Sequence, residues 1–155
     1  MIDSSIEQEL RENGAYISTT VGYSMWPMLR DRQDTVIIRA VEGNLRRGDV
    51  ALYKLPKGQY VLHRVLRVEG ENYRIAGDNC GVLETVPKQA VLGVLDGFYR
   101  GEKWIAPDNR GYAVYRWWIC AISPVHRWWV RTRTRLLRAG SRCKRALFGK
   151  KSTEK

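Results

Sequence analysis

Ser24 is the residue of this chain whose surroundings best fit a chemical role. It lies in Gly22-Tyr23-Ser24-Met25-Trp26-Pro27, where a segment rich in β-forming residues gives way to a bend. Gly22 lets the backbone approach closely, and Pro27 stiffens the exit of the bend. A nucleophilic serine needs an exposed hydroxyl on a rigid turn, with backbone N–H groups aimed at the developing oxyanion. Taken alone, the pattern also fits an ordinary turn serine.

A general base for such a serine is offered by His63, within Leu62-His63-Arg64-Val65. An imidazole with a pKa of about 6.5 accepts a proton at neutral pH, whereas a lysine base, for which Lys54 is the nearest candidate, would require deep burial. The alternative for His63 is a packed histidine of the core. Two acids, Asp78 in Gly77-Asp78-Asn79 and Glu84, could orient the imidazole as the third member of a triad does.

Several short motifs, taken together and in order, resemble the type I signal peptidases. Ser24-Met25-Trp26-Pro27 resembles their Ser-Met-x-Pro box, and Gly-x-Ser-Met is also similar to the nucleophile turn of the LexA-like self-cleaving repressors. The motifs that follow in the family's order are Gly48-Asp49-Val50, Leu62-His63-Arg64-Val65, Gly77-Asp78-Asn79 and Val91-Leu92-Gly93-Val94. The resemblance covers roughly residues 20–100.

The resemblance implies a site with Ser24 as nucleophile, His63 as general base and Asp78 as orienting acid. Asp78 is preferred to Glu84 because the Gly-Asp-Asn motif is the closer match. His63 places the chain with the endoplasmic-reticulum and archaeal branch, because bacterial signal peptidases usually have Lys there. Gly22 and Met25 are expected around the oxyanion and the substrate. A serine often stands at the position of Gly22, so here the Ser24 N–H would bind the oxyanion. No metal and no cofactor are implied.

The elements expected to position these residues are mainly β-strands. Residues 4–13 read as a short helix, and a four-residue hairpin loop, 56–59, makes the strands on either side of it antiparallel neighbours. Alternation along the second of them places His63 on one face with Val61 and Val65. The expected strands are 16–23, 35–40, 50–55, 60–68, 73–76 and 91–99. A signal peptidase/LexA-like β-sandwich or partly closed barrel is the predicted fold.

The composition changes after residue 109, which divides the chain into a predicted peptidase domain, 1–109, and a basic helical appendage, 110–155. The first part has 14 Lys and Arg against 15 Asp and Glu, and the second has 13 against one. Ser123 and Pro124 fit an N-cap and first helical position, and predict a helix from 124 to 139 that Gly140 ends. No internal repeat is expected. The Trp and Arg content of 111–140 predicts binding to an anionic membrane surface; packing on the β body and nucleic acid are the alternatives.

The remaining features bear on where the chain works. Cys80, Cys120 and Cys143 are odd in number and form no CxxC pair, so neither a disulfide framework nor a zinc site is expected. The polar, acidic start does not resemble a secretory signal, and no apolar stretch is long enough to span a bilayer. We expect a cytoplasmic protein, peripheral on the inner membrane face.

The predicted function is that of a serine endopeptidase that cleaves a leader, signal or propeptide through an acyl-enzyme. A small side chain before the cut is what the resemblance implies. One alternative is a LexA-like self-processing protein. The other is a non-catalytic membrane- or nucleic-acid-binding module on a peptidase scaffold. The substrate's identity and the oligomeric state stay open.

Overall fold

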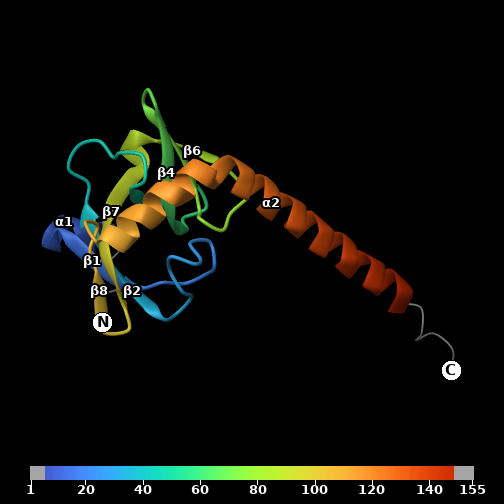
Figure 1. Cartoon of the computed structure of the whole chain (residues 1–155). Coiled ribbons are helices and arrows are strands. Elements are labelled where there is room, and N and C mark those ends of the chain that lie inside the picture. Colours follow the sequence, from blue (N-terminus) through green and yellow to red (C-terminus); the bar gives the residue numbers. More distant parts are fainter. Residues whose placement is uncertain (1–5, 149–155) are drawn as a thin grey trace.

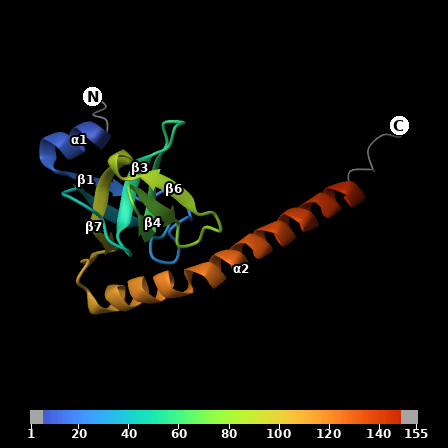
Figure 2. The ribbon, with the colours of Figure 1, turned by 90° about the horizontal axis from the view of Figure 1, so that it is seen from above.

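The structure is a computed structural model that describes residues 6–148, with side chains described for residues 6–133. It contains eight antiparallel strands, a short helix before them and a long helix after them (Figures 1 and 2). In chain order the elements are α1 (Ile6–Asn13), β1 (Ala15–Thr19), β2 (Asp34–Ala40), β3 (Val50–Lys54), β4 (Tyr60–Glu69), β5 (Asn72–Ala76), β6 (Glu84–Pro87), a 3₁₀ turn (Lys88–Ala90), β7 (Val91–Arg100), β8 (Lys103–Ile105) and α2 (Arg110–Phe148). The mainly β class with a helix at each end is confirmed.

All eight strands belong to one sheet rather than to the two sheets of a sandwich. The order is β1-β2-β7-β3-β4-β5-β6, with β8 beside β7. Within the described residues β1 and β6 are not paired with each other, so the sheet is not closed. Val50 and Leu52 of β3 pack in one hydrophobic cluster, whereas Ala51 and Tyr53 pack in a second. The sheet therefore has a buried core on each of its faces.

The predicted hairpin between β3 and β4 is confirmed, with a longer loop than expected. The loop has five residues, because Leu55 N–H donates to the Gln59 carbonyl at 2.8 Å and Lys54 pairs with Tyr60. This register places Ala51 directly opposite His63. Val61 and Val65 join the second hydrophobic cluster and Leu62 joins the first, so the predicted alternation around His63 is confirmed.

Other strand limits differ from the sequence expectation. The strand expected over 16–23 ends at Thr19, because the chain turns at Gly22. The short strands β6 and β8 were not expected, since each is only a few residues long and carries little periodic signal. Of the expected helix 4–13, residues 4 and 5 lie outside the described residues.

The long helix α2 begins fourteen residues earlier than expected. Its cap is Asn109, whose Oδ1 accepts the Tyr112 N–H at 3.1 Å, and not Ser123. The helix continues through Pro124 and past Gly140 to Phe148. Proline has no N–H for the carbonyl four residues earlier. That carbonyl, of Cys120, instead accepts a guanidinium N–H of Arg47 at 2.9 Å, which makes the proline tolerable inside the helix.

The first half of α2 packs on the β body. Ile119, Ser123 and Val130 are buried, and Tyr112 and Tyr115 pack against the cluster that contains Val50 and Leu52. The second half extends beyond the sheet (Figure 1). In the described part of the chain, no helix combines the length and the apolar character that a bilayer crossing requires.

Candidate active site

Ser24 lies in a tight turn that follows β1. Gly22 has a φ of +100°, a conformation that favours glycine, and its N–H donates to Asp31 Oδ1 at 2.6 Å. The Trp26 N–H donates to the Tyr23 carbonyl at 3.3 Å, which closes the chain around Ser24. Ser24 is half-buried, and the rings of Tyr23 and Trp26 in the same turn are exposed. The turn therefore holds the hydroxyl in one place while leaving it within reach of a ligand.

The Gly77-Asp78-Asn79 segment fastens this turn to the sheet. The Asn79 N–H donates to the Ser24 carbonyl at 2.8 Å, and the Asn79 side-chain amide donates to the Tyr23 carbonyl at 3.1 Å. A Cβ at residue 77 would lie 2.5 Å from the Ser24 carbonyl oxygen and 3.1 Å from the His63 ring. Only glycine lets the two backbones approach this closely.

His63 lies on β4 and is 7 % exposed. Its Nδ1 is 3.2 Å from the hydroxyl oxygen of Tyr53, and that hydroxyl donates to a carboxylate oxygen of Glu84. A tyrosine hydroxyl has a single proton. Because Tyr53 gives it to Glu84, the Tyr53 oxygen can only accept from His63, so the proton of the neutral imidazole is on Nδ1. The other nitrogen, Nε2, is then free to accept a proton.

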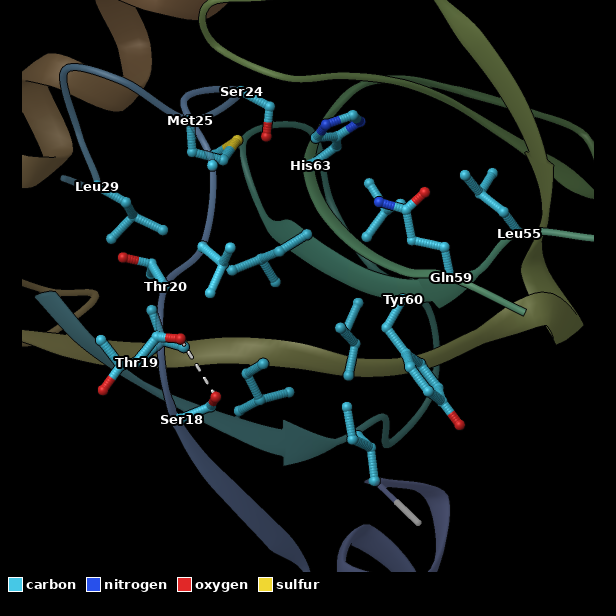
Figure 3. Close-up of a pocket in the computed structure, with 18 of the residues that line it drawn as sticks. Ser18, Thr19, Thr20, Ser24, Met25, Leu29, Leu55, Gln59, Tyr60 and His63 are labelled. Atoms are coloured by element: carbon cyan, nitrogen blue, oxygen red, sulfur yellow. Dashed lines mark hydrogen bonds between the residues drawn. The ribbon is translucent and has the colours of Figure 1, made fainter. Parts of the chain in front are cut away.

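Ser24 and His63 meet at one end of a pocket of about 520 Å³. The Ser24 hydroxyl and the His63 ring lie next to each other there (Figure 3). No hydrogen bond between the two is among those of the described residues, and such bonds often tighten only when a substrate is bound. The floor of the pocket is apolar, with Met25, Leu29, Val36, Ile38, Leu52 and Leu62.

Asp78, the acid expected to orient His63, has a different partner. Its two carboxylate oxygens accept from Arg64 Nε at 2.7 Å and Arg64 Nη2 at 2.8 Å, and one of them accepts the Tyr115 hydroxyl at 3.0 Å. Those bonds turn the carboxylate toward the arginine. The acid linked to the imidazole is Glu84, through Tyr53. Of the two candidate acids, the structure thus joins Glu84 to His63 and uses Asp78 elsewhere.

Arg64 is completely buried and connects several of the motifs. Besides the pair with Asp78, it donates to the Gly48 carbonyl at 2.7 Å and to the Met28 sulfur at 2.8 Å. Its Nη1 also lies 3.5 Å from the Tyr112 hydroxyl of α2. The serine turn, the Gly-Asp-Val segment, the Gly-Asp-Asn segment and α2 therefore meet at one guanidinium group. Breaking a buried ion pair by removing one partner typically costs about 3–5 kcal/mol.

The two residues expected around the oxyanion differ in what they can offer. The Gly22 N–H is already bound to Asp31, so Gly22 serves the shape of the turn and not the oxyanion. Met25 is buried in the pocket floor. Within residues 6–148, the hydrogen bonds include none from the backbone N–H of Ser24 or Met25. These two amides are therefore the donors that an oxyanion at Ser24 could use.

Burial sets the protonation of the groups near Ser24. It lowers the pKa of His63, and the negative charges of Glu84 and Asp78 partly oppose this effect. His63 is therefore neutral at neutral pH, as a general base must be. Burial also raises the pKa of the Cys80 thiol, which keeps this neighbour protonated and weakly nucleophilic. Lys54 Nζ is bound to Glu7 at 2.8 Å and its pKa is raised, so Lys54 does not fit a base.

Sequence reasoning missed the contributions of Tyr53, Asn79 and Tyr115. The Gly-Asp-Asn motif alone gives Asn79 no role, and Tyr115 lies in the segment predicted as an appendage. Tyr53 is two positions from the residue that pairs with His63, so it shares the face of His63 and lies diagonally across from it. The hairpin indicates this only when its loop has five residues and not the predicted four. The chain matches no model of a known protein family, and no curated protein compared with it is similar.

Proposed function

We propose that this protein is a serine endopeptidase in which Ser24 is the nucleophile and His63 the general base. The observation that carries the proposal is the hydrogen-bond order Glu84–Tyr53–His63. It leaves Nε2 of a neutral, buried imidazole free to accept a proton, and the ring lies next to the hydroxyl of Ser24 (Figure 3), on a turn with two unused amides. An ordinary packed histidine next to an ordinary turn serine would need none of these features.

In the proposed reaction, the Ser24 oxygen attacks the carbonyl carbon of a peptide bond while Nε2 of His63 takes its proton. The imidazolium formed is stabilised through Nδ1–H to Tyr53, whose own proton is held by the Glu84 carboxylate. The N–H groups of Ser24 and Met25 receive the oxyanion. His63 then gives its proton to the leaving amine. Water, activated by the same imidazole, hydrolyses the ester at Ser24.

The substrate is proposed to bind as an extended strand. Among the described residues, β1 pairs only with β2, which leaves its other edge open, and β5 pairs with β4 only from Arg64 onward. The open edges at 18–21 and 60–63 both line the pocket that leads to Ser24. A peptide backbone between them can hydrogen-bond to a strand edge, while alternate side chains point down to the apolar floor.

The substrate class proposed is a leader, signal or propeptide, and it comes from the resemblance to signal peptidases. The same resemblance suggests the superfamily fold and a small residue before the cut. The LexA-like alternative, cleavage of the chain by its own Ser24, uses the same chemistry. The two differ in whether the cut bond is within this chain.

Covalent labelling tests the proposed nucleophile. A fluorophosphonate probe should modify Ser24 in the folded protein, and mass spectrometry of the digested protein locates the label. His63→Ala should slow labelling by about a thousand-fold, because the base is lost. Ser123→Ala, which removes a hydroxyl on α2 outside the pocket, is the matched control and should label normally. Labelling at another residue, or at equal rates with and without His63, would refute the assignment.

Cleavage assays separate the two kinds of substrate. Ser24→Ala and His63→Ala should each reduce cleavage of a peptide substrate by about a thousand-fold or more with the fold retained. Prolonged incubation of the purified chain, followed by mass spectrometry for new termini, tests self-processing. If new termini form in the wild type and not in Ser24→Ala, the LexA-like alternative holds.

A further inference from the structure

The side of α2 that faces away from the sheet carries a stripe of large apolar side chains, which we call the outer face. Contrary to the expectation that this segment has no repeat, Val-x-Arg-Trp-Trp occurs twice, at 114–118 and 125–129. The two copies are eleven residues apart, close to three helical turns, so they lie on the same side of the helix about 16 Å apart. The outer face consists of Val114, Trp117, Trp118, Val125, Trp128 and Trp129.

These side chains are exposed although they are apolar. Trp117 is 72 % exposed and Trp128 is 67 % exposed. The opposite side of the helix, with Ile119 and Val130, is the one buried on the β body. A helix that packs by one face on its own protein normally has polar residues on the other. Packing within this chain therefore accounts for one apolar side of α2 and leaves the outer face without a partner in the described residues.

The charge around the outer face has one sign. From Arg110 to Phe148 the helix has no Asp or Glu. Arg131 and Arg133 are exposed, and by helical spacing they lie on the two flanks of the outer face. Arg127 lies on the side that faces the β body, where it contacts Ser123 Oγ at 3.2 Å and has no carboxylate partner among the described residues; burial lowers its pKa, and the charges of Arg131 and Arg74 lower it further. Such a cluster of positive charge favours an anionic partner.

We propose that the outer face of α2 binds the surface of an anionic lipid bilayer, with the helix lying in the plane of the interface. The tryptophan rings enter at the depth of the headgroups, and the flanking arginines meet lipid phosphates. Single-stranded nucleic acid can also stack on tryptophan rings, but it binds in a positively charged groove that follows its backbone, and the outer face is the convex surface of one helix. This inference goes beyond the proposed peptidase activity and does not depend on it.

The arrangement also sets where the candidate site would lie. The β body is on the side of α2 opposite the outer face (Figure 2). The Tyr115 hydroxyl of α2 donates to Asp78, and Asp78 is paired with Arg64. Arg64 in turn contacts Met28, so this chain of contacts connects the serine turn to the same helix. The thickness of α2 would therefore separate the pocket from the lipid by at least one helix diameter, about 10 Å.

Vesicle binding tests the proposal with the full chain. The protein should float with vesicles of phosphatidylcholine and phosphatidylglycerol and bind pure phosphatidylcholine vesicles much less. Bound protein should show a blue-shifted tryptophan emission that brominated lipid quenches. Higher salt should weaken binding without abolishing it, because charge attraction is screened while indole insertion is not. A full chain that ignores the anionic vesicles at low salt would overturn the proposal.

Substitutions assign the binding to the outer face. Trp117→Ser combined with Trp128→Ser should weaken vesicle binding by at least about ten-fold, since two buried indoles are lost. Trp26→Ser removes an indole that is 53 % exposed but lies outside α2, and should bind as the wild type does. Circular dichroism checks the fold of each variant. If a variant fails to fold, quenching of the wild-type protein by brominated lipid still shows whether tryptophan rings enter the bilayer.

Two other results would each replace the lipid with a different occupant. A wild type that is a dimer without lipid, and becomes monomeric with the double substitution, would make the outer face an interface between two copies. Tighter binding to single-stranded DNA than to vesicles, with a steep dependence on salt, would make it a nucleic-acid surface.

Discussion

The hydroxyl oxygen of Tyr53 lies 3.2 Å from Nδ1 of His63, and its proton is directed to Glu84. A tyrosine in this place couples an acid to a histidine that the acid does not touch. Burial and the Glu84 carboxylate both raise the pKa of Tyr53, so the phenol keeps its proton through the neutral range. Tyr53 therefore acts as a fixed connector, and the tautomer of His63 depends on it.

Tyr53→Phe tests this connection. Loss of the hydroxyl leaves Nδ1 without an acceptor and removes the preference for a free Nε2, so kcat/KM should fall by about 10- to 100-fold. Steady-state cleavage of a peptide substrate measures the effect. Tyr73→Phe is a matched control, because it removes the hydroxyl that accepts the Leu45 N–H in the same hydrophobic cluster. It should lower stability and leave kcat/KM nearly unchanged; equal losses in both variants would argue against the connector.

The expected pH dependence of the proposed reaction follows from the burial of His63. The base works when it is neutral, so kcat/KM should rise with pH and level off, with an apparent pKa below the usual value of about 6.5 for histidine. The Glu84 charge raises the pKa of His63 against the effect of burial. Glu84→Gln should therefore move the apparent pKa still lower. A shift upward in this variant, or a rise only above pH about 8.5, would require another base.

Asp78→Asn is predicted to act on stability. The change leaves the fully buried Arg64 without its carboxylate partner, which should reduce the free energy of unfolding by about 3 kcal/mol. Denaturant unfolding measures this loss. The apparent pKa of kcat/KM should move slightly lower, and less than in Glu84→Gln, because the Asp78 charge also raises the pKa of His63 but has the smaller effect. An Asp78→Asn protein of unchanged stability whose apparent pKa moves further than that of Glu84→Gln would return Asp78 to the role of orienting acid.

Gly77→Ala is predicted to displace the serine turn. The new methyl group would meet the Ser24 carbonyl at 2.5 Å and the Cys80 sulfur at 2.9 Å, so the backbone of the turn must move. A displacement of about 1 Å at a reacting group can cost about 100-fold in rate, and probe labelling of Ser24 should slow accordingly. Gly111→Ala, in the first turn of α2, is the control: its methyl group would lie 3.3 Å from the cap oxygen of Asn109 and away from Ser24, so labelling should be normal. Normal labelling of Gly77→Ala would show that the turn tolerates the movement.

Most of the strands, and the candidate pair Ser24 and His63, could be predicted from the sequence, because alternation and turn residues are local signals. The role of Tyr53 as the connector between Glu84 and His63 could not be predicted. A four-residue loop pairs Leu55 with Tyr60 and places Leu52 opposite His63, whereas the five-residue loop places Ala51 there. A shift of one residue turns every side chain to the other face of the sheet. In the expected register, Tyr53 would point away from His63.

The start of α2 was missed for a different reason. A serine followed by a proline is a strong local sign of a helix start and predicts one at residue 124. The cap at Asn109 gives a weaker local sign. The proline is accepted inside the helix because Arg47, seventy-three residues away, takes over the carbonyl of Cys120. The partner of Asp78 was also set at long range, since Tyr115 reaches it only once α2 is docked. Contacts of this kind leave no local pattern in the sequence.

The position of Arg64 has a consequence for the order of events during synthesis. Its partners come from residue 28, residue 48, residue 78 and, through Tyr112, the beginning of α2. A nascent chain that has left the ribosome only as far as β8 already has Ser24 and His63 but cannot complete this set. The turn that carries Ser24 acquires its full anchorage only after Tyr112 and Tyr115 have emerged and docked. A chain interrupted before that point would carry the proposed nucleophile and base without the framework that aligns them, and is expected to be inert.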